Sequence, residues 1–183
     1  MKYYMNKLCV ILFTLLVLVG FSSCTTEDNY EWRRGTLNLS TEFDDEPIHT
    51  DNRGRFSFSY DLRAEDIGGI DVRRMEIVDV SSYSSEIFLF RGELFRPGDL
   101  INIRLGADGV NTRILRMIVG NDREAIVIDA DHYLLKEFMA DMVYNLARRG
   151  QLRFYIDGEL VSTPQSTYFD FEVLNDFDFE IRY

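Results

Sequence analysis

The stretch Tyr168–Tyr183 reads YFDFEVLNDFDFEIRY. It holds two blocks in which apolar side chains occupy every second position and charged ones mostly fill the positions between, the first at 169–173 and the second at 177–183. This alternation is typical of β-strands that bury one face and expose the other. Asn175 and Asp176 separate the blocks and predict a turn between two antiparallel strands.

The same alternation recurs along the chain from Thr36 onward, for example at 55–62, 101–105 and 152–156. Asp108-Gly109 and Asp157-Gly158 lie between apolar runs and predict tight hairpin turns. Short strands separated by such turns indicate a mainly β protein, which we expect to be an antiparallel β-sandwich, immunoglobulin-like or transthyretin-like. The apolar runs Ile87–Phe90 and Ala125–Ile128 are the expected central strands.

Residues 131–149 break this pattern and predict one amphipathic α-helix. Apolar residues recur there at helical spacing, namely Leu135, Met139, Met142, Val143 and Leu146. Asp129 or Asp131 can cap the beginning of the helix, and Gly150 suits the position just after its end. We expect the apolar stripe to pack on the sheet.

The N-terminal 23 residues are predicted to be an export signal. Lys2 and Lys7 precede an uncharged, mostly apolar run over 8–20, which is shorter than a membrane-spanning helix requires. Ser22-Ser23-Cys24 follows and resembles the lipobox of bacterial lipoproteins. The resemblance implies removal of residues 1–23 and lipidation of Cys24. Residues 24–35 are then an acidic tether, and 36–183 a single β-sandwich domain.

The residues after Cys24, TTEDN, resemble the surface-export signal of Bacteroidota lipoproteins. This resemblance implies a Gram-negative envelope protein held in the outer membrane by its lipid, because two or more acyl chains give stable anchoring. Whether the domain faces the cell surface or the periplasm stays open.

A further short run, TDNRGRFSF at 50–58, resembles the turn and strand of carboxypeptidase-regulatory-like, transthyretin-type sandwiches. That resemblance adds support for a β-sandwich and implies no function.

Charge excludes one class of partner. The whole chain has 20 basic and 31 acidic residues, and removal of Lys2 and Lys7 leaves 18 − 31 = −13. A chain this acidic lacks the basic stripe that nucleic-acid binding needs. Cys9 lies in the export signal, so Cys24 is the only cysteine of the mature chain and no disulfide can form within it.

Catalytic and metal-binding motifs are absent from the sequence. Neither His49 nor His132 lies in a recognisable nucleophile or zinc motif, and no phosphate-binding glycine loop occurs. Asp129, Asp131 and His132 are close along the chain, as are the acids at 44–46, but neither group has the spacing of a known calcium loop. We therefore predict a protein that is not an enzyme and needs no cofactor, with a calcium site left open.

Aromatic residues are the remaining candidates for a binding function. Tyr83, among serines, and Tyr168, beside Thr167, are the expected exposed tyrosines and candidate ligand contacts; Trp32 falls in the tether. We predict a non-catalytic binding role toward a glycan or an envelope protein. Two alternatives stay open: a subunit of a fimbria-like assembly, favoured by a last strand that ends at Tyr183 and could exchange with a neighbour, and a small hydrolase built on the acidic loops.

Overall fold

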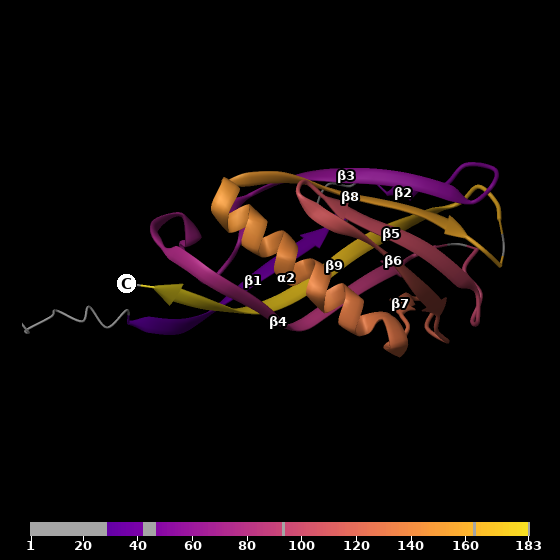
Figure 1. The fold of residues 1–183 in the computed structure, drawn as a ribbon. Coiled ribbons are helices and arrows are strands. Elements are labelled where there is room, and N and C mark those ends of the chain that lie inside the picture. The colour runs from indigo at the N-terminus through magenta and orange to yellow at the C-terminus, as the bar shows by residue number, and fades with distance from the viewer. Residues whose placement is uncertain (1–28, 42–46, 93, 163, 183) are drawn as a thin grey trace, which may run out of the picture.

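The structure is a computed structural model that describes residues 29–41, 47–92, 94–162 and 164–182 (Figure 1). The predicted export signal, Cys24 and the acidic loop at 44–46 lie outside the described residues. The strands are β1 (Tyr30–Ser40), β2 (Ile48–His49), β3 (Arg55–Arg63), β4 (Glu76–Phe90), β5 (Leu100–Ala107), β6 (Val110–Val119), β7 (Ala125–Val127), β8 (Gln151–Leu160) and β9 (Tyr168–Arg182). Helix α2 (His132–Arg149) follows β7, and short 3-10 turns occupy Ala64–Asp66, Val72–Arg74 and Asp129–Asp131.

The strands form one antiparallel sheet in place of the two sheets of the expected sandwich. The order is β1-β9-β4-β7-β6-β5-β8-β3, and β2 pairs with β9 beside this path. The mainly β class and the helix predicted at 131–149 are confirmed. The two apolar runs expected to be central lie in β4 and β7, which pair with each other inside the sheet.

β9 is one continuous strand, so the predicted turn at Asn175-Asp176 is wrong. Its odd-numbered residues from Phe169 to Ile181 all point inward and are at most 1% exposed. Asn175 belongs to this buried row, where its side-chain amide donates a hydrogen bond to the carbonyl of Leu37 at 3.3 Å. Strand β9 pairs with β1 on one side and β4 on the other. The last strand is therefore central and does not present the free edge that the fimbrial alternative assumed.

β1 begins at Tyr30, so six residues assigned to the tether belong to the sheet. Asp108-Gly109 does turn between β5 and β6, with Gly109 at φ +81°. Asp157-Gly158, in contrast, lies within β8. Gly158 pairs with Phe56 and Ile103, and a Cβ at this position would collide with the Phe56 ring. The glycine makes room for a neighbouring strand's side chain.

The sheet curls until its far strands meet. Phe56 on β3 contacts Phe169 on β9 with ring centroids 4.9 Å apart, and Phe58 contacts Phe171 at 4.8 Å. These strands are separated by five others in the sheet order. Curling brings the two apolar rows together, so that one continuous core fills the concave side.

Helix α2 packs across this concave side, mainly against β4 and β6 (Figure 1). Its buried residues are Leu135, Phe138, Met139, Met142, Val143 and Leu146, which includes every apolar position predicted from the spacing. Gly150 ends it in a left-handed conformation, as predicted. No helix among the described residues has the length and apolar character needed to cross a membrane.

Asp131 precedes the helix but does not cap it with its side chain. Its carboxylate instead accepts hydrogen bonds from the guanidinium of Arg116 on β6, at 3.0 and 2.9 Å, and from the Arg116 backbone N–H at 2.9 Å. These bonds, first of all those from the Arg116 guanidinium, hold the pKa of Asp131 below its ordinary value. The pair connects the start of α2 to the sheet.

We expect Asp131→Asn to lower the free energy of unfolding by about 1–2 kcal/mol, because it removes charge-assisted hydrogen bonds. A carboxyl whose pKa is lowered by folding stabilises the protein above its unfolded pKa and loses that contribution as pH falls through the folded value. The free energy of unfolding of the wild type should therefore decrease as the pH drops below about 4. This decrease should be steeper in the wild type than in the variant. Urea titrations between pH 7 and pH 2.5 measure this, with exposed Asp129→Asn as control; equal acid dependence in Asp131→Asn and wild type would contradict it.

Candidate binding face

The exposed aromatic residues gather on the outward face of β1, β9 and β4. Five aromatic side chains are exposed among the described residues: Tyr30, Trp32, Tyr83, Tyr133 and Tyr168. Tyr30 and Trp32 are on β1 and Tyr83 is on β4, with exposed fractions of 51%, 54% and 45%. Tyr30, Trp32 and Tyr83 therefore lie on the two strands that flank β9.

Sheet register shows which residues share this face. Trp32 lies opposite Glu180 of β9, which in turn lies opposite Asp79 of β4. Directly paired residues of antiparallel strands point to the same side, and the buried row of β9 points to the other. We name the outward residues Tyr30, Trp32, Arg34, Tyr83, Asp178 and Glu180 the aromatic platform.

Arg34 connects the two sides of the aromatic platform. Its guanidinium carbon lies 5.6 Å from the centroid of the Tyr83 ring, within the range of a cation–π contact. The same guanidinium lies 3.6 Å from the Asp178 carboxylate. A planar cation, a carboxylate and an aromatic ring are thus in contact on one open surface.

A β-bulge places Tyr83 on this face. Ser82 pairs with Phe177 and Ser84 with Asp176, so Tyr83 is an extra residue in β4. The ammonium of Lys136, on α2, donates a hydrogen bond to the Tyr83 carbonyl at 2.9 Å, and the Ser82 hydroxyl donates to the Ser84 carbonyl at 3.2 Å. Bulges of this kind change the direction of a side chain. The hydrogen bond from Lys136 of α2 stabilises this bulge.

The two tyrosines predicted as ligand contacts do not form one site. Tyr168 is nine residues along β9 from Phe177, the partner of Ser82, which corresponds to about 30 Å at the rise of an extended strand. Tyr168 instead packs beside His49, with ring centroids 6.2 Å apart. Trp32 and Arg34, which the sequence placed in a tether, are the residues that accompany Tyr83.

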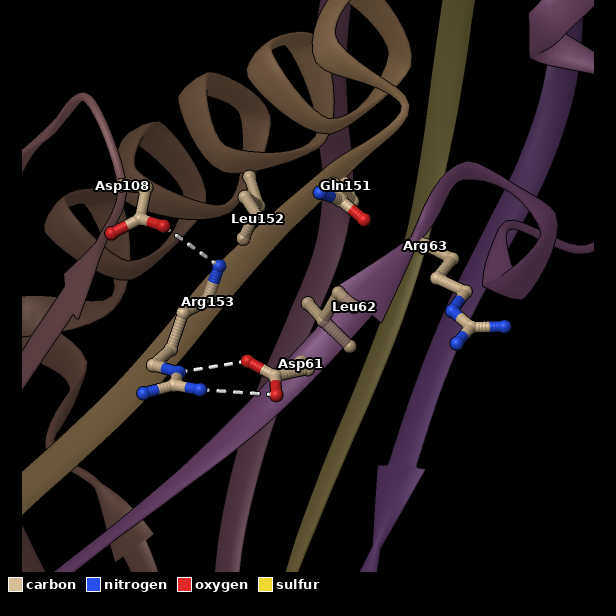
Figure 2. Close-up of a pocket in the computed structure, with 7 residues that line it drawn as sticks. All are labelled: Asp61, Leu62, Arg63, Asp108, Gln151, Leu152 and Arg153. Atoms are coloured by element: carbon tan, nitrogen blue, oxygen red, sulfur yellow. Dashed lines mark hydrogen bonds and ion pairs between the residues drawn. The ribbon is translucent and has the colours of Figure 1, made fainter.

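A polar hollow of about 490 Å³ opens beside β3 and β8 (Figure 2). The Arg153 guanidinium donates to both oxygens of Asp61 at 2.7 and 3.1 Å, and the Arg153 backbone N–H donates to Asp108 at 3.1 Å. Arg63 points away from this pair. The lining holds no histidine, serine or cysteine, and its main charged groups satisfy one another.

A second hollow, of about 550 Å³, lies where β4 ends and β6 turns into β7. Arg91 and Arg123 line it, and they are the two non-glycine residues with positive φ in the described chain, at 58° and 67°. Arg123 occupies the tight turn between β6 and β7, where its N–H donates to Gly120. Asp122 and Glu124 also line the hollow, so it has no excess of positive charge.

Two of the residues considered for metal binding, Asp131 and His132, are engaged elsewhere. Asp131 binds Arg116, and the Nε2 of His132 lies 3.0 Å from the Val127 carbonyl. Within the described ranges, no three histidine, cysteine, aspartate or glutamate side chains are grouped so that they could hold a metal ion.

Comparison with known proteins assigns no family. No protein-family model and no curated protein matches the chain. One similar solved structure is the module TmCBM61 in complex with beta-1,4-galactotriose, at 12% identity over 83% of this chain and 88% of that one, with a TM-score of 0.30. Another is desmodium yellow mottle tymovirus, at 7% identity over 85% and 90%, also with 0.30. Scores of this size are too low to establish a common fold.

We expect Lys136→Met to loosen the bulge without unfolding the protein, because it removes one donor to an exposed carbonyl. Hydrogen–deuterium exchange of peptides covering 82–85 should become about three- to tenfold faster, the factor that corresponds to one hydrogen bond.

Arg149→Met is the matched control, since that guanidinium donates to the Asp108 carbonyl at 2.9 Å on another part of the sheet. Its exchange should rise near residue 108 and stay unchanged at 82–85. If both variants leave the bulge as in the wild type, Lys136 does not hold it.

Proposed function

We propose that the protein is a lipid-anchored envelope protein that binds a neutral glycan chain on the aromatic platform, without chemical turnover. The observation that carries this proposal is the gathering of three of the five exposed aromatic side chains on one face, beside Arg34 and the carboxylates of β9.

The residue types of the platform suit sugars. An aromatic ring packs its apolar face against the C–H face of a pyranose, while its polar rim stays hydrated. Carboxylates accept hydrogen bonds from hydroxyl groups and the guanidinium donates to them. Trp32 and Tyr83 supply rings on either side of Asp178 and Arg34, so one ligand can use both kinds of contact.

The shape and charge of the platform narrow the ligand class. Its rings lie on open sheet surface and not in the hollows near Asp61 or Arg91, and small molecules generally bind in enclosed pockets. An open surface of this kind suits the side of an extended polymer. The acidic residues on β9 disfavour polyanions, which directs the proposal to neutral glycans.

The rival functions receive less support. The fimbrial alternative rested on a free edge at the last strand, whereas β9 is paired on both sides. A hydrolase would need a pair of available carboxylates in a cleft, whereas Asp61 and Asp108, which line the hollow beside β3 and β8, both accept hydrogen bonds from Arg153.

Trp32→Ala and Tyr83→Ala should each weaken glycan binding about five- to tenfold, the cost of one lost stacking contact of about 1 kcal/mol. Native gels containing soluble neutral polysaccharides (β-glucan, galactan, xylan or mannan) measure this as loss of retardation of the full chain. Polysaccharide chain length should stay unchanged after incubation with the protein.

Tyr133→Ala is the control, because Tyr133 is 61% exposed but lies on α2, outside the strands that carry the platform. It should migrate as the wild type does. Wild-type protein that none of the four polysaccharides retards, or platform variants that are retarded as strongly as wild type, would contradict the proposal.

The anchor is proposed at Cys24, from the sequence pattern before it. Cells fed an alkyne-bearing palmitate analogue should label the wild-type chain in its membrane fraction, and Cys24→Ala should lose the label and leave that fraction. Equal labelling of both chains would contradict lipidation at this residue.

A further inference from the structure

β1 is an edge strand with an open side. It pairs with β9 alone, apart from one bridge in which Thr36 and Gly68 exchange backbone hydrogen bonds of 3.0 and 2.8 Å. That bridge shows which groups face outward. Thr36 directs its N–H and C=O away from β9, so by alternation Trp32 does the same.

The described residues provide no strand beside 30–33 to pair with these outward groups. An open row of N–H and C=O groups is a template for another strand, and monomeric proteins usually protect it with proline, charged side chains or a very short edge strand. β1 is eleven residues long, YEWRRGTLNLS, and contains no proline, and its neighbouring charges Glu31 and Arg33 are of opposite sign, so they repel only a strand that lacks the matching charges.

The sequence of this edge is complementary to itself. In an antiparallel second copy centred on Trp32, Glu31 lies opposite Arg33 of the second copy, and Arg33 lies opposite its Glu31. Tyr30 lies opposite the second copy's Arg34, and the two Trp32 side chains are adjacent. Opposite charges and aromatic pairs in direct register stabilise antiparallel strands.

Neighbouring registers lack this match. Centring the pair on Arg33 or on Glu31 brings two like charges face to face, which destabilises antiparallel strands. In these two registers the central residue directs its N–H and C=O toward β9, so these groups cannot bond to the second copy. A centre on Arg34 again opposes two arginines and runs the second strand against Gly68, which already occupies the edge at Thr36. Among these registers, only the one centred on Trp32 satisfies both charge and hydrogen bonding.

We infer that a second copy of this chain pairs with the edge of β1, antiparallel and centred on Trp32, to form a symmetric dimer with one continuous sheet. Such two-fold interfaces are the commonest in homo-oligomers. The inference is independent of glycan binding, since Glu31 and Arg33 lie on the face opposite the aromatic platform. The two platforms would adjoin at Trp32.

Charge-swapped variants test this pairing. Glu31→Arg puts arginine at both 31 and 33, and Arg33→Glu puts glutamate at both, so each variant repels a second copy of itself. An equimolar mixture restores opposite charges at all four positions. Because each variant loses the same internal Glu31–Arg33 ion pair, restoration on mixing can come only from contact between copies.

Sedimentation of the full chain in mild nonionic detergent, over a hundredfold range of concentration, measures the oligomeric state. We expect twice the monomer mass for the wild type, the monomer mass for each variant alone and twice that mass for the mixture, with circular dichroism confirming that both variants fold. A monomeric wild type, a dimeric single variant or a mixture that stays monomeric would each overturn the inference.

Discussion

Burial of the inner row of β9 is the constraint on which the remaining structure depends. Seven alternate positions of this strand, from Phe169 to Ile181, are shielded from water. They line the core along the length of the strand. A strand buried on one face must expose its other face, because side-chain direction alternates. The acidic residues of β9 are therefore outward, and the same alternation in β1 sets Trp32 and Arg34 beside them.

Alternation along the chain predicted the mainly β class, and helical spacing predicted the helix, because burial of one face leaves its period in the sequence. It could not predict how the strands are joined. A two-sheet sandwich and one curled sheet bury the same alternating residues, and the contact between Phe56 and Phe169 that closes the curl links positions far apart in the chain. The errors at Gly158 and Asn175 have the same origin. Glycine and asparagine favour turns locally. Here, however, Gly158 leaves space for the Phe56 ring, and Asn175 donates a hydrogen bond to the neighbouring strand β1.

The candidate site was predicted only in part. Tyr83 stood out because it lies among small polar residues, and it is exposed as expected. The residues that contact Tyr83 come from other elements and depend on how the strands pair. Arg34 of β1 contacts its ring across β9, and Lys136 of α2 donates a hydrogen bond to its carbonyl. Trp32 was assigned to the tether because the residues around it are charged and show no apolar alternation. Its membership of the sheet follows from pairing with β9, a contact that no local pattern reports.

The chain contains a single tryptophan, and it is the half-exposed Trp32. Indole fluorescence excited beyond the absorption of tyrosine therefore comes from one position at the edge of the sheet. A molecule that covers this ring will change the emission without any added label. Loss of the core will change it little, since the ring is already in contact with water when the protein is folded. Tryptophan emission in this protein is thus a detector of surface contact, and its folding has to be followed by a signal from the backbone.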